Sequence, residues 1–475
     1  MSGDSARLPT RLKIFHGFGS IAYGVKENGF STFLLLYYNQ VLGMDAWRVS
    51  IALLIAMVID AFLDPIIGHA SDRTYSRFGR RLPWLYAAAI PLSLAWIALW
   101  NPPTVEGWAG FAWLTGTAVV VRGLISCCEV PSVAILPELT QDYDERTQLM
   151  SMRYLFAWIG GLVIAVLAYS VFLVSDEPGV VGQLQPEGYG KYALSGAVLM
   201  SVAVLISARG QHKRLARLPA ARPEPTTARE ALGHIWEAVS HPAFLVLASC
   251  VAMGSLSAQV TFALSNYLYI FVWKFPEVWF RYYPLLILFS VLIAIYLVSH
   301  SHRKHGKRKA VARAVVIGNF FWATPFLLRL AGIWPEVGSN FSTALVFGFF
   351  FMGNLFAVIV SISLASMIAE VVEASEQQTG RRSEGVLYAG NLFVQKCATG
   401  MGILLSGLII DFAGLEAKAD PTKVPASVVD TLTLIYIVMV LLLASVLAWR
   451  VGHFPITRDD HEERLRNLAE RRTTA

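Results

Sequence analysis

Charged residues are scarce in this chain of 475 residues. Asp, Glu, Lys and Arg together make up 15% of it, whereas 55% is hydrophobic and the mean hydropathy is +0.53. Soluble globular domains carry about 25% charged residues. The composition therefore excludes an ordinary soluble protein and indicates a membrane protein.

Cysteine is also rare, and its spacing fits neither a disulfide framework nor a zinc site. We expect no cofactor. The beginning of the chain lacks the features of a cleavable signal peptide, because Arg7, Arg11 and Lys13 lead into a first apolar stretch that is too long and too polar. All four cysteines fall within apolar stretches: Cys127, Cys128, Cys250 and Cys397.

About twelve apolar stretches of roughly 20 residues follow one another, each long enough to cross about 30 Å of hydrocarbon as a helix. They lie at residues 14–42, 46–69, 83–101, 108–137, 149–174, 190–208, 242–272, 278–300, 311–331, 341–370, 386–414 and 428–450. We predict an all-α membrane protein with twelve transmembrane helices in two six-helix bundles.

Basic residues gather in alternate loops, which predicts the orientation, because short cytoplasmic loops retain Lys and Arg. The loops at 101–107 and 175–190 are nearly free of them. Both termini are therefore expected in the cytoplasm. The net charge of +6 and the pI near 9.1 follow from this bias and from contact with lipid headgroups, without nucleic acid. The basic loop residues are Arg73, Arg77, Arg80, Arg81, Lys213, Arg214, Arg217, Arg303, Lys304, Lys307, Arg308 and Lys309.

The chain divides into two similar halves. Ser76–Arg81 is echoed by His302–Lys309 at an offset near 227 residues, and the acidic segment Glu138–Arg146 is echoed more weakly by Glu370–Glu384. Basic loops can also resemble each other by chance. We predict bundles at 1–208 and 242–450, a cytoplasmic linker at 209–241 with a short amphipathic helix from Thr227, and a tail at 451–475.

Asp60 and Asp64 stand in the apolar run Ile51–Gly68. On a helix, positions i and i+4 share a face with Cβ atoms about 5–6 Å apart, close enough for both carboxylates to hold one small cation. Acids inside a membrane usually line a polar cavity. Two close carboxylates repel, so one of them should hold a proton when no cation is bound. Alternatively, either aspartate pairs with Lys396 or caps a helix.

More charges interrupt other stretches. Lys26, Glu27 and Asn28 lie in the middle of the first, and Arg122 precedes Glu129 by two helical turns. With Arg153 and Lys396, the cavity would offer four cations and would suit an anionic solute as well as a neutral sugar. The alternative is mutual pairing, for example Lys26 with Glu129 or Arg122 with Glu27.

At this point the residues carry a resemblance to a known family. The run Asp60–Arg73 with Ser76–Trp84 resembles the signature of the glycoside-pentoside-hexuronide:cation symporters, a group within the major facilitator superfamily that is typified by melibiose permease. Weaker matches follow in the right order: Gly17–Gly19, Tyr37, Tyr38, Glu129–Pro131, Leu136, Pro137, Arg153 and Lys396.

The resemblance implies roles for single residues. Asp60 and Asp64 would bind the cation, with Ser126 as a hydroxyl ligand. Glu129 would bind the sugar, with Arg153 as its basic partner, and Lys396 would lie between the halves.

Two positions depart from the family pattern. Leu63 replaces a common asparagine ligand for sodium, which makes a proton relatively more competitive. Gly24 replaces a sugar-binding aspartate, so the family's clamp on galactosides is incomplete.

A third group resembles the superfamily's cytoplasmic gate, in which ion pairs hold one state. It comprises Asp72, Arg73, Arg80 and Arg81 in the first half and Glu370, Glu373, Arg381, Arg382 and Glu384 in the second. Simple retention of positive loops is the other explanation for the arginines.

The sequence thus predicts a secondary transporter, and not an enzyme, in a bacterial inner membrane. We expect H+- or Na+-coupled symport of a sugar, glycoside or uronate by alternating access, through a monomer in contact with membrane lipids. A lipid-like amphiphile as the solute, a transporter-like sensor and an intramembrane hydrolase built on the aspartate pair are the alternatives.

Overall fold

The computed structural model of the protein describes residues 8–74, 76–140, 142–175, 177, 180–215, 240–379 and 384–456. Within these ranges, every element of regular secondary structure is a helix. The predicted helix from Thr227, the tail after residue 456, Arg217, Arg381 and Arg382 lie outside the described residues.

The helices form two compact units. Among the described residues, the first unit comprises 8–215, 406–411 and 416–420, and the second comprises 240–405, 412–415 and 421–456. The short pieces of 406–420 that join the first unit contact its helices directly. The side chain of Gln40 donates to Glu416 O at 3.0 Å and accepts from Ala419 N at 3.0 Å.

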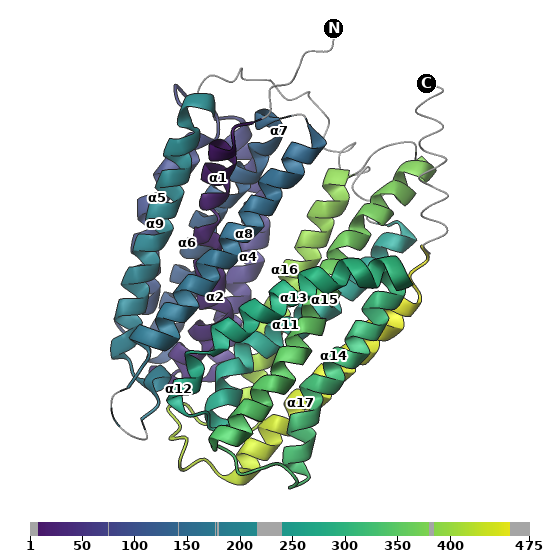
Figure 1. Cartoon of the computed structure of the whole chain (residues 1–475). Coiled ribbons are helices and arrows are strands. Elements are labelled where there is room, and N and C mark those ends of the chain that lie inside the picture. Colours follow the sequence, from purple (N-terminus) through teal and green to yellow (C-terminus); the bar gives the residue numbers. More distant parts are fainter. Residues whose placement is uncertain are drawn as a thin grey trace. The chain divides into compact units, whose positions relative to one another are not determined.

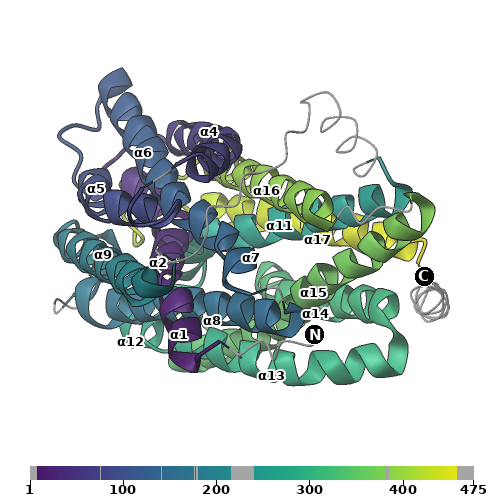
Figure 2. The ribbon, with the colours of Figure 1, turned by 90° about the horizontal axis from the view of Figure 1, so that it is seen from above.

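The first unit is a bundle of long helices in which α4 packs on α6, α5 on α6 and α9, and α8 on α1 and α2. Figures 1 and 2 show α5 and α9 side by side. Its elements are α1 (Thr10–Phe18), α2 (Ile21–Asn28), η1 (Gly29–Phe33), α3 (Leu34–Leu36), η2 (Tyr37–Val41), α4 (Ala46–Asp72), α5 (Leu82–Trp100), α6 (Gly107–Ala134), α7 (Leu136–Leu139), α8 (Tyr143–Leu167), η3 (Ala168–Phe172), η4 (Gly182–Leu184) and α9 (Glu187–Leu215).

The second unit has its own apolar core, in which α14 packs on α15 and α17 while α11 packs on α15 and α17. Its elements are α11 (Pro242–Tyr267), η5 (Leu268–Val272), α12 (Glu277–Phe280), α13 (Tyr283–His305), α14 (Lys307–Leu330), α15 (Asn340–Thr379), α17 (Ala426–Gly452) and α16 (Glu384–Phe412) apart from its residues 406–411.

Eleven helices of the described residues are long and apolar enough to cross a membrane, from Ala46–Asp72 to Ala426–Gly452. They coincide with eleven of the predicted stretches, although α15 continues nine residues beyond the predicted end at 370, to Thr379. The first stretch, 14–42, folds as a series of shorter helices from α1 to η2. The full number of twelve, and the side on which the termini lie, stay predictions.

The first and second units repeat one turn. After η2, Leu42 N donates to Tyr37 O at 2.9 Å and Met44 N donates to Tyr38 O at 2.8 Å. After η5, Trp273 N and Phe275 N donate to Leu268 O and Tyr269 O, both at 2.9 Å. The residue in the middle of each turn has a positive φ, 94° at Gly43 and 47° at Lys274. This shared geometry is independent of the basic-loop echo in the sequence.

Candidate functional site

Asp60 is buried between α4 and α6. Its side chain accepts two hydrogen bonds from α6, from Ser126 Oγ to Oδ1 at 2.9 Å and from an Arg122 guanidinium nitrogen to Oδ2 at 3.1 Å. Asp60 and Arg122 are each only 4% exposed. The resemblance predicts Asp60 and Ser126 as neighbouring cation ligands, and the fold brings them together. Arg122, assigned from the sequence to the solute cavity, lies here instead against an aspartate.

Asp64 follows Asp60 by one helical turn on α4 and is half buried. The next residue, Pro65, lies inside the helix and has no N–H. It therefore cannot donate to Ala61 O, which lies between the two aspartates, and this carbonyl loses its helical donor. Leu63 packs on α6, where a Cβ added to Gly123 would lie 3.3 Å from Leu63 Cδ1. The position therefore contributes packing and no polar ligand.

Glu129 and Arg153 form an ion pair between α6 and α8. Arg153 is buried and also donates to Ser132 Oγ on α6. The fork of the guanidinium thus spans one turn of α6 and holds the Glu129 carboxylate in place. Ser132 is a partner that sequence reasoning missed, and no motif pointed to it.

Arg122, Ser126 and Glu129 lie on one face of α6. Their spacing of four and then three residues is that of a helical stripe, with neighbouring Cβ atoms about 5–6 Å apart. Ser126 and Arg122 contact Asp60 on α4, whereas Glu129 contacts Arg153 on α8. One helix face therefore joins the two groups of ionised side chains.

The polar residues of the first stretch pair close by. Lys26 Nζ lies 2.7 Å from Glu27 Oε2 and 4.3 Å from the centre of the Tyr23 ring. Asn28 accepts a hydrogen bond from the Tyr192 hydroxyl on α9 at 3.3 Å. The mutual pairing considered as the alternative is therefore present, but with partners other than the two examples, Lys26 with Glu129 and Arg122 with Glu27. Lys26 pairs with Glu27 because Glu27 is the adjacent residue and lies within reach of the lysine side chain.

Gly24 lies where α2 crosses α8 with almost no space between the backbones. A Cβ at this position would lie 1.9 Å from Ala157 O, and one at Gly160 would lie 2.5 Å from Ile21 O. A side chain cannot project from position 24 in this packing. The absence of the family's aspartate at this position therefore goes with the close packing of α2 on α8, which leaves no space for a side chain, as well as with the loss of a polar group.

The arginines after α4 meet two acids. Arg81 pairs with Asp72 at 2.6 Å, and Arg80 pairs with Glu138 of α7 at 2.5 Å. Arg81 also lies 3.5 Å from Glu138, whereas Arg73 is exposed. Glu138 was missing from the predicted gate. The echo of its segment around Glu370 was the signal that would have identified it.

The second unit contains a corresponding pair. Lys307, which lies 227 residues after Arg80, is 3.0 Å from Glu370 of α15. Glu373 follows on α15, and Glu384 begins α16. Lys396 is half buried on α16 in the same unit. In each unit, therefore, a residue of the basic segment pairs with a residue of the acidic segment: Arg80 with Glu138, and Lys307 with Glu370.

The described residues contain no group of three or more His, Cys, Asp or Glu side chains placed to hold a metal ion. The donors around Asp60 and Asp64 are two carboxylates, the Ser126 hydroxyl and backbone carbonyls. Such an oxygen set suits a proton or a hard monovalent cation.

Comparison with known proteins identifies the family. Residues 15–458 match the family described as MFS/sugar transport protein. The chain belongs to this family. The family model and the relatives support a glycoside-pentoside-hexuronide:cation symporter-like family, as the signature around Asp60 predicted.

Two relatives and one solved structure show the extent of the likeness. The chain is 24% identical to the inner membrane symporter YicJ of Escherichia coli (strain K12), covering 92% of this chain and 90% of that protein. It is 25% identical to the isoprimeverose transporter of Lactiplantibacillus pentosus, covering 82% and 77%. A bacterial homologue of the iron transporter ferroportin in an inward-facing state shares the fold, with a TM-score of 0.63 and 14% identity over 94% of this chain and all of that one.

The protein is thus a multi-pass transporter of the bacterial inner membrane and is not an enzyme. The alternative of an intramembrane hydrolase is excluded. Its role is membrane transport of sugars, and several of its relatives, YicJ among them, are named symporters.

Proposed function

We propose that the protein is a secondary active transporter that couples entry of a sugar, glycoside or uronate to entry of H+ or Na+. Twelve helices would span the membrane in two six-helix bundles that alternate about a central site, with both termini in the cytoplasm. The predicted linker start at 209 is wrong, because α9 continues through polar residues to Leu215; the segment after that helix would join the bundles. The observation that carries the proposal is the arrangement of Arg122, Ser126 and Glu129 on one face of α6.

Asp60 and Asp64 would form the cation site. Arg122 supplies Asp60 with an internal positive charge, so Asp60 needs no second cation to stay buried as a carboxylate. The coupling ion would therefore act mainly on Asp64, with Ser126 and the Ala61 carbonyl as further oxygens. A proton needs no ligand shell, which favours H+ because Leu63 contributes no polar atom.

Glu129 and Arg153 would bind the solute. A carboxylate and a guanidinium held together present acceptors and donors to adjacent sugar hydroxyls, and the arginine alone would pair with a uronate. Lys26, Glu27 and Asn28 would line the cavity from the first helix, and Lys396 would reach it from the second bundle.

Coupling would run through α6. Loading of Asp64 changes the charge beside Asp60, which changes how strongly Asp60 holds Arg122 and Ser126. Because Glu129 lies on the same stripe, a small shift of α6 alters its pairing with Arg153. Cation and solute would then favour each other's binding by the same factor, as linkage requires.

Ion pairs at the ends of the helices would bias the alternation. Asp72, Arg73, Arg80 and Arg81 with Glu138 would act in one bundle, and Glu370, Glu373, Arg382 and Glu384 with Lys307 in the other. A partly exposed pair contributes about 0–1 kcal/mol. Several such pairs are enough to shift a two-state equilibrium severalfold.

The test is uptake into proteoliposomes of labelled pentosides, glycosides and uronates under separately imposed proton and sodium gradients. Accumulation above the outside concentration that depends on one gradient would establish symport and identify the ion. Equilibration without accumulation under both gradients would show a uniporter. Absence of uptake for the whole panel, together with uptake of a lysolipid, would replace the sugar with an amphiphile.

A further inference from the structure

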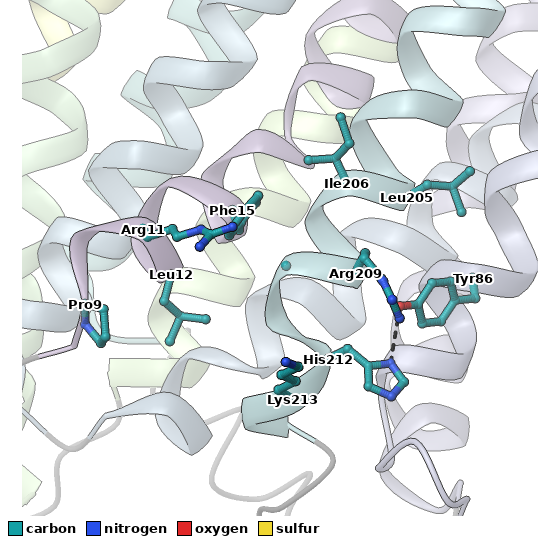
Figure 3. A pocket seen from close by; sticks show the side chains of 11 residues that line it. Pro9, Arg11, Leu12, Phe15, Tyr86, Leu205, Ile206, Arg209, His212 and Lys213 are labelled. Atoms are coloured by element: carbon teal, nitrogen blue, oxygen red, sulfur yellow. Dashed lines mark hydrogen bonds between the residues drawn. The ribbon is translucent and has the colours of Figure 1, made fainter.

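A pocket of about 850 Å³ lies in the first unit where α1 begins, α5 begins and α9 ends. Figure 3 shows side chains of α1 and α9 around it, with Tyr86 of α5 on one side. None of the residues that line it takes part in the ion pairs of Asp60 or Glu129, and the transport mechanism makes no use of it.

The polar lining is basic. Arg11, Arg209, His212 and Lys213 face the pocket, and none of the residues that line it is Asp or Glu. Arg11, Arg209 and Lys213 are exposed and form no ion pair within the described part of the chain. Three positive charges within one hollow repel one another, so a bound anion would stabilise the arrangement.

The wall of the pocket is fixed by close packing of α1 on α9. A Cβ added to Gly210 would lie 2.2 Å from the Phe15 ring, so the absent side chain lets the ring rest on the helix. At the next residue of each helix, His16 Nδ1 and Gln211 Oε1 are 2.9 Å apart. On the other side, the Tyr86 hydroxyl lies 3.3 Å from His212 Nδ1. These contacts preform the site before any ligand binds.

An apolar row leads away from the basic end. Along α9, exposed side chains recur every four residues at Leu194 (59%), Val198 (55%), Val202 (44%) and Ile206 (37%). Such i, i+4 positions form a continuous ridge on a helix. Ile206 lines the pocket, so the ridge ends beside Arg209 and Lys213. The predicted apolar stretches begin at residue 14 on α1 and end at residue 208 on α9. Arg11, Arg209 and Lys213 lie just outside these limits and are therefore expected at the depth of the lipid headgroups.

We propose that this pocket binds one anionic phospholipid, with its phosphate on Arg11, Arg209 and Lys213 and one acyl chain along the row from Ile206 to Leu194. Basic pockets between transmembrane helices are suited to anionic headgroups. A free phosphate would contact the basic side chains but not the apolar row. A zwitterionic lipid carries a positive charge in its headgroup, which the three basic side chains would repel. Under the proposed orientation, the lipid comes from the cytoplasmic leaflet.

The experiment is native mass spectrometry of the full-length protein in mild detergent, titrated with dioleoylphosphatidylglycerol or with dioleoylphosphatidylcholine. The pocket variant is Arg209→Gln with Lys213→Gln. The matched control is Lys191→Gln with Arg214→Gln, which removes the same charge from the same helix outside the pocket. Ile206→Ser tests the apolar row, and thermal unfolding checks that each variant is folded.

We expect one tightly bound phosphatidylglycerol in the wild type and the control, and affinity at least about tenfold weaker in the pocket variant. Ile206→Ser should weaken binding of phosphatidylglycerol, because it removes an apolar contact of the acyl chain. Equal affinity of pocket variant and control would overturn the proposal. It would also fail if phosphatidylcholine bound as tightly, or if millimolar inorganic phosphate displaced the lipid, which would indicate a small-anion site.

Discussion

Asp60 on α4 and Arg122 on α6 form a buried ion pair, 3.1 Å between Oδ2 and the guanidinium nitrogen. Both side chains are about 95% buried, so water screens the pair weakly. Arg122 balances, within one bundle, the charge of the Asp60 carboxylate, which the sequence predicts to bind the transported cation. Under the proposed mechanism, Asp60 would be the fixed charge and Asp64 the exchangeable one.

Removing either partner of this pair should destabilise the protein strongly, because it leaves an uncompensated buried charge. We expect Arg122→Gln and Asp60→Asn each to cost about 3–5 kcal/mol of unfolding free energy, and the double variant to cost less than their sum. Thermal unfolding in detergent measures all three. The control pair is Arg329 with Asp430, 2.9 Å apart and half exposed at the aspartate, where losses should stay below about 1 kcal/mol. Strict additivity at Asp60 and Arg122 would show that the two charges are energetically independent.

Neutralising Asp64 should separate coupling from solute movement. Asp64→Asn resembles the protonated acid permanently, so we expect gradient-driven accumulation in proteoliposomes to be lost while exchange of internal for external solute persists. Asp430→Asn, which removes an acid from the surface of the second unit, should accumulate solute like the wild type. Full accumulation by Asp64→Asn would mean that the aspartate is structural. Loss of exchange as well would place Asp64 in the solute site.

The acids that bind the basic loops should set the rate of alternation. Glu138→Gln removes the acid shared by Arg80 and Arg81, and Glu370→Gln removes the partner of Lys307. Because each pair contributes about 1 kcal/mol or less, we expect a change of up to about fivefold in exchange rate for each variant, with little change in thermal stability. Glu106→Gln, an exposed acid at the beginning of α6, is the control. Rates equal to the wild type in both variants would reduce these pairs to passive loop charges.

The repeated turn offers a test of backbone strain. Lys274 adopts a φ of 47°, whereas its counterpart Gly43 adopts 94° without a Cβ to strain. Left-handed backbone costs a residue with a Cβ roughly 1 kcal/mol relative to glycine. Lys274→Gly should therefore raise the unfolding temperature and Gly43→Ala should lower it. If both substitutions lowered it, the Lys274 side chain would be making contacts that outweigh the strain.

The apolar runs were sufficient to predict the helices, because hydrocarbon thickness fixes their length and composition. Eleven predicted stretches coincide with helices, and the largest differences lie at ends where a helix continues through polar residues. α15 continues to Thr379 and α9 to Leu215, through residues that composition assigned to a loop and to the linker. The neighbourhood of Asp60 and Ser126 followed from the resemblance. The partner of Arg122 did not, since several acids were within plausible reach and only the rotations of the helices decide among them.

Gly24 shows that the identity of a residue in the sequence does not reveal the space around it in the fold. Its identity suggested a missing polar ligand, but its space is occupied by the backbone of α8, with Ala157 O 1.9 Å from an added Cβ. Gly24→Ala should therefore separate α2 from α8 and cost about 1–3 kcal/mol or more. Gly116→Ala is the matched control, because nothing lies within 4 Å of its added Cβ on α6 and alanine favours helix by up to about 1 kcal/mol. The unfolding temperature should fall for Gly24→Ala and should stay the same or rise for Gly116→Ala. If Gly24→Ala were as stable as the wild type, α2 and α8 would be able to part at little cost, and an aspartate at this position would again be compatible with the fold.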